Sequence, residues 1–202
     1  MMLNLDKAVV IGKGSSRICY VHPEDAGKCI KINFSGNPKI TTEELSHYRR
    51  YQRRKISWEM AAVSYGKVDT SAGEGVVFSL ARDHDGNISR TLDYYLQSVK
   101  LPFALDDLAD ALETFKWYLL EERIVVRELK ADNLVYQRTG SQQGKMIIVD
   151  GIGNNECLPL ANYSRLFSTR AVSRKWRKFR NSLPVLYPGN SRVLRLVEML
   201  SD

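Results

Sequence analysis

The chain is poor in cysteine and has no long hydrophobic segment. Its 202 residues include three cysteines, Cys19, Cys29 and Cys157, which are widely spaced and form no Cys-x-x-Cys pair. This pattern argues against a zinc site and a disulfide framework, so we expect reduced thiols, with Cys19 and Cys29 on neighbouring strands as core residues. The longest apolar runs are far shorter than the roughly 20 residues that cross a bilayer.

The first residues also lack the features of a secretory signal. Residues 1–7 contain neither a basic segment nor a long apolar stretch, both of which a signal peptide has. We therefore expect a cytoplasmic protein. The hydrophobic content of 44% is ordinary for a globular protein, and the length is enough for one domain or for two small lobes that share a core.

Positive charge exceeds negative charge and is unevenly distributed. The formal net charge is +7, and much of the excess lies at residues 49–55 and 170–180. A basic surface attracts phosphate-rich partners of any kind, so the charge alone identifies no partner. The run 170–180 predicts an amphipathic helix that packs Val172, Trp176 and Phe179 inward. The alternative is a helix that binds an anionic membrane or nucleic acid.

The first 80 residues predict a small sheet and one helix. Residues 41–51 have helical periodicity, and β-prone runs between turn-rich segments occur at residues 8–12, 17–22, 28–34, 65–68 and 75–80. We expect these five strands to form one sheet that ends near Leu80. The polar residues 82–88 would form a loop in which Asp83 and Asp85 cap turns.

Gly12 and Gly14 lie between the first two predicted strands. Because glycine has no Cβ, backbone N–H groups in such a turn can approach phosphate oxygens closely. A Gly-x-Gly pair alone is also typical of an ordinary hairpin turn, so both interpretations stay open. Lys31 favours the phosphate interpretation because it is a charged residue inside an apolar strand. The alternative is that Lys31 lies on the solvent-exposed face of an edge strand.

The predicted helix at 41–51 carries two acidic residues near its start. Glu44 is our first candidate for pairing with Lys31, and Glu43 is a further contender. However, Thr41-x-x-Glu44 also matches a capping box, in which Glu44 would bond the helix N-terminus instead.

The second half of the chain predicts helices around a short hairpin. Apolar runs at 134–136 and 146–149 flank a polar turn, and we expect helices at 92–99, 105–122, 158–167 and 172–183. The apolar stripe of the second helix predicts core packing; it consists of Leu105, Leu108, Ala109, Leu112, Phe115 and Leu119.

Four polar residues around this hairpin have the spacing of a catalytic motif. Glu128 lies five residues before Asn133, Lys130 lies between them, and the second strand ends at Asp150 before a glycine. Protein kinases arrange their catalytic loop and their metal-binding Asp in this way. Two positions depart from the kinase pattern, because Val126 replaces the His and Glu128 replaces the Asp that acts as base. A plain turn at Asp150 is the alternative, and we expect Asp132 to be at the surface.

Together these motifs resemble the protein-kinase-like fold over about residues 8–155. More closely, residues 19–26, 29–32 and 129–133 resemble the YrbL family, small bacterial proteins named as members of the PhoP regulatory network. The resemblance implies an α+β fold in one bilobal domain. It would comprise a five-stranded antiparallel N-lobe, residues 1–80, and a truncated helical C-lobe, residues 81–202.

The resemblance also implies ATP and Mg²⁺ as cofactors. Asp150 would link a metal ion to the β- and γ-phosphates and Asn133 would hold a second ion, since Mg²⁺ prefers oxygen ligands. The other implied nucleotide-binding residues are Gly12, Gly14, Lys31 and Glu44.

Catalysis would involve Glu128, Lys130 and Lys31. Lys130 would neutralise the γ-phosphate, and Glu128 can still accept a hydroxyl proton because it is a carboxylate, one methylene longer than Asp. General-base catalysis contributes roughly 10²–10⁴-fold, so a displaced carboxylate would weaken activity without removing all of it. The alternative is an inactive site in which Glu128 only pairs with Arg127 or Lys130.

Three functions stay open. The first is phosphoryl transfer to a small non-peptide or lipid-like acceptor, since residues 151–202 contain no Ala-Pro-Glu and leave little room for peptide-binding helices. The second is a pseudokinase that regulates an unidentified protein. The third is an anionic-surface binder that uses residues 170–180; peripheral membrane contact is compatible with this function, whereas we do not expect a nucleic-acid partner.

Overall fold

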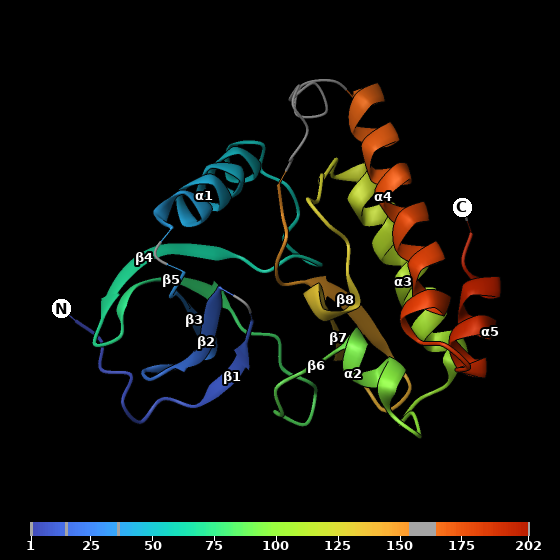
Figure 1. Ribbon diagram of the computed structural model, residues 1–202, viewed down its shortest axis with the longest axis horizontal. Helices are drawn as coiled ribbons and strands as arrows, with labels where there is room; N and C mark the ends of the chain where they lie inside the picture. Colours follow the sequence, from blue (N-terminus) through green and yellow to red (C-terminus); the bar gives the residue numbers. More distant parts are fainter. Residues whose placement is uncertain (1, 15, 36, 154–164, 202) are drawn as a thin grey trace. The chain divides into compact units, whose positions relative to one another are not determined.

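The computed structural model describes residues 2–14, 16–35, 37–153 and 165–201 (Figure 1). The chain divides into two compact units. Unit 1 consists of residues 1–55 and 62–81, and unit 2 consists of residues 56–61 and 82–202. The predicted boundary near Leu80 lies close to the end of unit 1, whereas the assignment of residues 56–61 to unit 2 was not foreseen.

Unit 1 contains a five-stranded antiparallel sheet, as predicted. Its strands lie in the order β1 (Val10–Lys13), β2 (Arg17–His22), β3 (Asp25–Asn33), β5 (Gly73–Ser79) and β4 (Ser64–Thr70). β3 starts earlier than predicted because its hairpin turn with β2 is short, and His22 pairs directly with Asp25. β3 is therefore the central strand, so the alternative that placed Lys31 on an edge strand is wrong.

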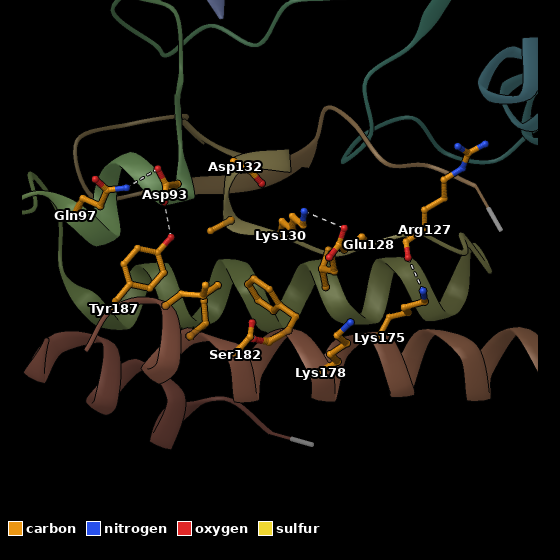
Figure 2. Close-up of a pocket in the computed structure, with 15 residues that line it drawn as sticks. Asp93, Gln97, Arg127, Glu128, Lys130, Asp132, Lys175, Lys178, Ser182 and Tyr187 are labelled. Carbon is orange, nitrogen blue, oxygen red and sulfur yellow. Dashed lines mark hydrogen bonds and ion pairs between the residues drawn. The ribbon is translucent and has the colours of Figure 1, made fainter. Parts of the chain in front are cut away.

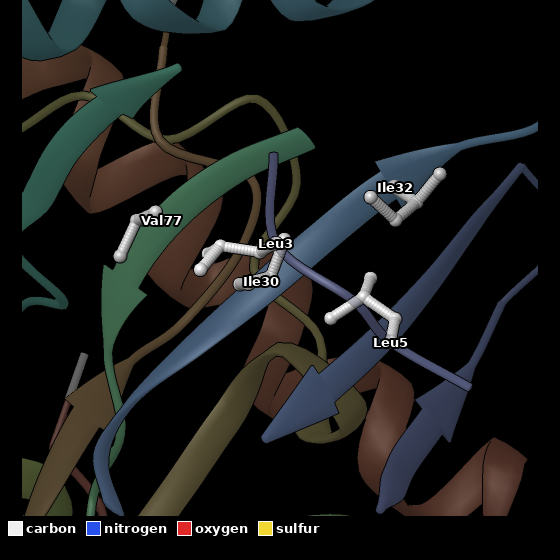
Figure 3. Packing of buried hydrophobic residues seen from close by; sticks show 5 residues of the cluster. All are labelled: Leu3, Leu5, Ile30, Ile32 and Val77. Atoms are coloured by element: carbon white, nitrogen blue, oxygen red, sulfur yellow. The ribbon is translucent and has the colours of Figure 1, made fainter. Parts of the chain in front are cut away.

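One face of this sheet is covered by the N-terminal segment. Leu3 and Leu5 pack with Ile30 and Ile32 of β3 and with Val77 of β5 (Figure 3). The segment is fixed because the Leu3 amide donates to the Asp69 carbonyl at 2.9 Å. The alternation of strand side chains leaves Lys31 on the opposite face from its two isoleucine neighbours.

The helix α1 (Pro38–Arg53) connects β3 to β4. It begins after Asn37, whose side chain accepts a hydrogen bond from the Lys39 amide. The capping box predicted for Thr41 and Glu44 is wrong, because both residues lie inside the helix rather than at its N-terminus. Tyr48 of α1 packs edge-on against Phe78 of β5, with ring centroids 5.3 Å apart.

Unit 2 contains a three-stranded antiparallel sheet and helices. Its elements are β6 (Arg90–Thr91), α2 (Leu92–Gln97), α3 (Leu105–Glu121), the 3₁₀ turn η1 (Ala131–Asn133), β7 (Leu134–Arg138), β8 (Gly144–Ile148), α4 (Arg165–Leu186) and α5 (Ser191–Met199). β6 and α5 were not predicted. Of the helix expected at 158–167, residues 158–164 lie outside the described part, and the rest belongs to α4.

The core of unit 2 confirms the apolar patterns of its helices. The α3 side chains Leu108, Leu112 and Phe115 are fully buried, as are Val172, Trp176 and Phe179 of α4. The basic run at 170–180 is therefore part of an amphipathic helix that packs its apolar face inward. No helix in the described part of the chain is long and apolar enough to cross a membrane.

The loop before β6 is fixed by a buried ion pair. Asp83 accepts hydrogen bonds from the backbone N–H of Arg138 at 3.0 Å, from its Nε at 2.7 Å and from Ser89 Oγ at 2.6 Å. Asp85 accepts from Arg138 Nη2 at 2.6 Å and from the Asn87 amide at 3.0 Å. Both acids stabilise the turns around them, as their sequence context predicted.

The two described cysteines lie on neighbouring strands, as expected. Cys19 is in β2 and Cys29 in β3, and both are free thiols. Their contact and the positive charge of Lys31 lower the pKa of the Cys29 thiol. Cys157 lies outside the described residues.

Candidate functional site

The candidate catalytic loop follows a buried turn at the end of α3. Val125 and Val126 are 1% exposed, so Val126 fills the position of the kinase His with a core side chain. Residues 125–127 run antiparallel to residues 151–153. The Arg127 amide donates to the Gly151 carbonyl at 2.7 Å, and the Gly153 amide donates to the Val125 carbonyl at 3.0 Å. The loop is therefore fixed to the segment that follows Asp150.

Asn133 and Asp150 are brought together by the β7–β8 hairpin. Leu134 pairs with Ile148, and one step further the Val149 amide donates to the Asn133 carbonyl at 2.9 Å. Asn133 thus lies just before β7 and Asp150 just after β8, at the same end of the hairpin. The sequence prediction that these two residues flank a hairpin end agrees with this arrangement.

Gly151 has the backbone conformation and the close contacts that require glycine. Its φ is +80°, a region that other residues rarely adopt. An added Cβ would lie 3.1 Å from the Asn133 side-chain nitrogen and 3.1 Å from the Glu128 carbonyl oxygen. The Gly151 amide donates to Asp150 Oδ1 at 2.6 Å, which orients the carboxylate. Three segments of the motif therefore meet at Gly151.

Glu128 and Lys130 form an ion pair on the surface of this loop. Their charged atoms are 2.9 Å apart, and the side chains are 53% and 49% exposed. The hydrogen bond that Lys130 donates to the Glu128 carboxylate raises the pKa of Lys130. Exposed pairs of this kind stabilise a fold by only about 0–1 kcal/mol, so the fold does not depend on it.

A cavity of about 1020 Å³ lies beside the loop in unit 2 (Figure 2). Its walls come from the loop, from α2 and from α4. The polar lining residues are Asp93, Gln97, Arg127, Glu128, Lys130, Asp132, Lys175, Lys178, Ser182 and Tyr187, and the others are Leu129, Ala131, Phe179, Leu183 and Leu186. Asp132 is exposed, as expected.

The donor atoms near Gly151 fit Mg²⁺ held together with phosphates. Asp150 and Asn133 offer oxygen ligands, and Mg²⁺ commonly takes only one or two protein carboxylates beside phosphate oxygens and water. The described part of the chain contains no group of three or more His, Cys, Asp and Glu residues that could hold a metal by themselves.

In unit 1 the candidate phosphate-binding residues Gly12 and Lys31 lie on β1 and β3, and Gly14 directly follows β1. Gly12 is exposed in β1, and no atom lies within 4 Å of a Cβ built on it. The Gly14 amide already donates to the Arg17 carbonyl at 2.8 Å, which closes the turn. The Lys31 ammonium lies 4.8 Å from the centre of the Phe78 ring, a cation–π contact.

Glu44 forms an ion pair that the sequence analysis missed. It is 4% exposed, and its Oε2 lies 2.5 Å from Nη1 of Arg17 on β2. The pair connects α1 to the sheet. The pairing of Lys31 with Glu44 or Glu43 stays a prediction. Arg17 is next to the glycine turn in sequence, and that position is the only sequence signal for its role.

Two lysines of α4 are further residues that sequence reasoning did not connect with the loop. Lys175 donates from Nζ to the Arg127 carbonyl, and Lys178 lines the cavity one turn later. In the sequence they are indistinguishable from the other cations of the run 170–180. Only the packing of Trp176 and Phe179 determines which cations face the loop.

Comparison with known proteins identifies the family. The uncharacterized protein YrbL of Escherichia coli K12 and that of Shigella flexneri are each 33% identical to this chain over 181 residues, which cover 88% of this chain and 86% of theirs. The crystal structure of the Mycobacterium tuberculosis PknI kinase domain, a double mutant, aligns with a TM-score of 0.46 and 10% identity. That alignment covers 70% of this chain and 56% of the kinase domain. The family model of the PhoP regulatory network protein YrbL matches residues 3–184, and the chain belongs to this family.

Proposed function

We propose that this protein binds Mg-ATP and transfers a phosphoryl group to a small non-peptide acceptor. The meeting of Asn133, Asp150 and the Glu128 segment at Gly151 supports the proposal most strongly. Around this hairpin end, hydrogen bonds join the segments that carry two oxygen ligands and a general-base candidate. Phosphoryl transfer depends mainly on such positioning and on electrostatic stabilisation.

In unit 2 each residue has a distinct role under this proposal. Asp150 and Asn133 would hold Mg²⁺, which neutralises phosphate charge when it is bound. Glu128 would accept the proton of the attacking hydroxyl. Lys130 would leave its ion pair with Glu128 to contact the transferred phosphoryl group, at little cost because the pair is half exposed.

Unit 1 offers the groups that would bind phosphate oxygens. Lys31 carries its ammonium on the central strand of the sheet, and the open space around Gly12 allows a ligand to approach the backbone closely. The Arg17–Glu44 ion pair would position α1 against β2.

A second candidate is a nucleotide-binding pseudokinase that regulates a protein partner within the PhoP network. It is favoured by the buried Val126 at the His position and by the ion pair that engages Glu128. Both candidates require the metal–nucleotide site, and only the first requires turnover.

The first test is thermal unfolding of the full chain with ATP, in the presence and absence of Mg²⁺. Binding to the folded state raises Tm, by an amount that grows with ligand concentration above Kd. We expect a Mg²⁺-dependent rise in the wild type and none in Asp150→Asn. The surface variant Asp106→Asn, which removes an equal charge from the start of α3, should keep the rise. A wild type that shows no Mg²⁺-dependent rise would overturn both candidates.

A further inference from the structure

We propose that the cavity beside residues 127–132 is the acceptor site, and that the acceptor is a soluble hydroxylated molecule with one anionic group and an apolar portion. This inference rests on the proposed function, because it assigns a substrate class to the same loop. The cavity volume of about 1020 Å³ lies at the upper end of the range of small-molecule pockets, roughly 300–1,000 Å³. It is much larger than a bare phosphate or a simple triol requires.

The α4 wall of the cavity supplies positive charge. Lys175 and Lys178 are three residues apart and therefore lie on one face of the helix. Lys175 is held by the Arg127 carbonyl, whereas Lys178 forms no ion pair with any residue that the structure describes. Figure 2 shows both lysines on the side of the loop that carries Glu128. An anionic group of the ligand would neutralise the positive charge of the lysines at this end of the cavity.

The α2 wall of the cavity is suited to hydroxyl groups instead. Asp93 accepts hydrogen bonds from the Tyr187 hydroxyl at 2.6 Å and from Gln97 Nε2 at 2.8 Å (Figure 2). Burial and the bond to Asp93 raise the pKa of Tyr187, so its hydroxyl stays protonated. The Asp93 carboxylate can accept further hydrogen bonds from ligand hydroxyls, and it would repel a second anion. The difference in charge between the two walls would therefore determine the orientation in which a ligand binds.

Apolar side chains line the cavity between these polar groups. Phe179 and Leu183 are buried, whereas Leu186 is 62% exposed although it lines the cavity. A ligand with an apolar portion would cover Leu186 and remove that surface from water. Glu128 lies on the loop wall at the end that the lysines occupy, so a hydroxyl that it deprotonates would lie next to the anionic group of the ligand.

The test uses a matched pair of probes, 4-(hydroxymethyl)benzoate and 4-(hydroxymethyl)benzamide, in amide chemical-shift titrations of the full chain without nucleotide. The probes share their shape and hydroxyl and differ in charge. We expect the benzoate to shift amides of Ala131, Ser182 and Tyr187 and to bind more tightly than the benzamide. Lys178→Gln should weaken benzoate binding about fivefold or more, the usual effect of losing a charge-assisted hydrogen bond.

The control is Arg177→Gln, which removes the same charge from an exposed α4 position outside the cavity lining. Equal binding of the two probes, equal weakening in both variants, or no shifts in the cavity would overturn the inference. The proposed function is judged separately, because Lys178→Gln should keep the Mg-ATP-dependent rise in Tm. If the benzoate binds in the cavity but Mg-ATP produces no rise in Tm, the cavity is a binding site for this ligand class and the proposed phosphotransferase activity is refuted.

Discussion

Two of the ion pairs in unit 2, Asp83–Arg138 and Glu128–Lys130, differ in character. Asp83 is 3% exposed at its side chain and accepts three hydrogen bonds, two of them from Arg138. Glu128 is 53% exposed and is joined to Lys130 by a single ion pair. A buried acid that loses its partner destabilises a protein by several kcal/mol, whereas an exposed pair contributes about 0–1 kcal/mol.

The difference separates a structural pair from a pair that is available for chemistry. Asp83 and Arg138 fix a loop to β7, and any movement would leave a buried charge. Glu128 and Lys130 can separate and contact other groups because water already solvates them. We therefore expect substitutions at the first pair to affect folding and substitutions at the second to affect turnover.

The largest expected effect is on turnover in Glu128→Gln. Loss of the general base should lower ADP formation from Mg-ATP by roughly 10²–10⁴-fold, or about 3–5 kcal/mol of barrier. Stability should change by no more than about 0.5 kcal/mol. A coupled assay for ADP and urea unfolding measure the two effects. A wild type that binds Mg-ATP but forms no ADP would establish the pseudokinase instead.

The next effect is on folding in Asp83→Asn. The variant removes the buried charged partner of Arg138 and leaves it only the more exposed carboxylate of Asp85. The free energy of unfolding should fall by about 3 kcal/mol. Asp85→Asn is the matched control: its side chain is 35% exposed, so the loss should stay below about 1 kcal/mol. Similar losses in the two variants, measured by urea unfolding, would remove the contrast between buried and exposed pairs.

A comparable contrast, between a closely packed position and an open one, can be tested in unit 1 with two glycines. A Cβ on Gly75 would lie 2.6 Å from side-chain carbons of Ile30 and Ile32, whereas a Cβ on Gly12 would meet nothing within 4 Å. Gly75→Ala should destabilise the protein by about 1–3 kcal/mol through overpacking. Gly12→Ala should change stability by at most about 0.5 kcal/mol while weakening the Mg-ATP response. Thermal unfolding with and without nucleotide measures both; a normal response in Gly12→Ala would separate this glycine from phosphate binding.

The smallest expected effect is on stability in Lys130→Gln. Removing an exposed partner of Glu128 should lower the free energy of unfolding by about 0.5 kcal/mol or less. ADP formation should nevertheless fall, because Lys130 would no longer contact the transferred phosphoryl group. A stability loss well above this value in urea unfolding would show that the pair is structural after all.

Much of the fold could be predicted from the sequence because local patterns determine it. β-Prone runs between turn-rich segments indicated the five strands, and the 3.6-residue period of α3 indicated its buried face. The start of α1 was missed, since the capping signal at Thr41 matched as well as the true cap at Asn37. β6 is too short for a period to be recognised.

The candidate site was predictable only in part. The spacing of Glu128 and Asn133 indicated one loop, and Asp150 was expected at the end of the second strand. The hairpin brings Asn133 and Asp150 together. The Arg17–Glu44 pair and the lysines of the cavity were missed because they depend on packing between elements distant in sequence. A charge in a run of cations gives no signal of which neighbour it will face.

The most direct test of the account is paramagnetic broadening by Mn²⁺, which substitutes for Mg²⁺ at oxygen sites. In the presence of ATP, amide signals of Asn133 and Gly151 should broaden first, and those of Asp83 and Asp85 should stay sharp. Asp150→Asn should abolish the effect. Broadening centred on Asp83 and Asp85, or no broadening at Asn133 and Gly151 with nucleotide bound, would contradict the central claim that this hairpin end holds the metal.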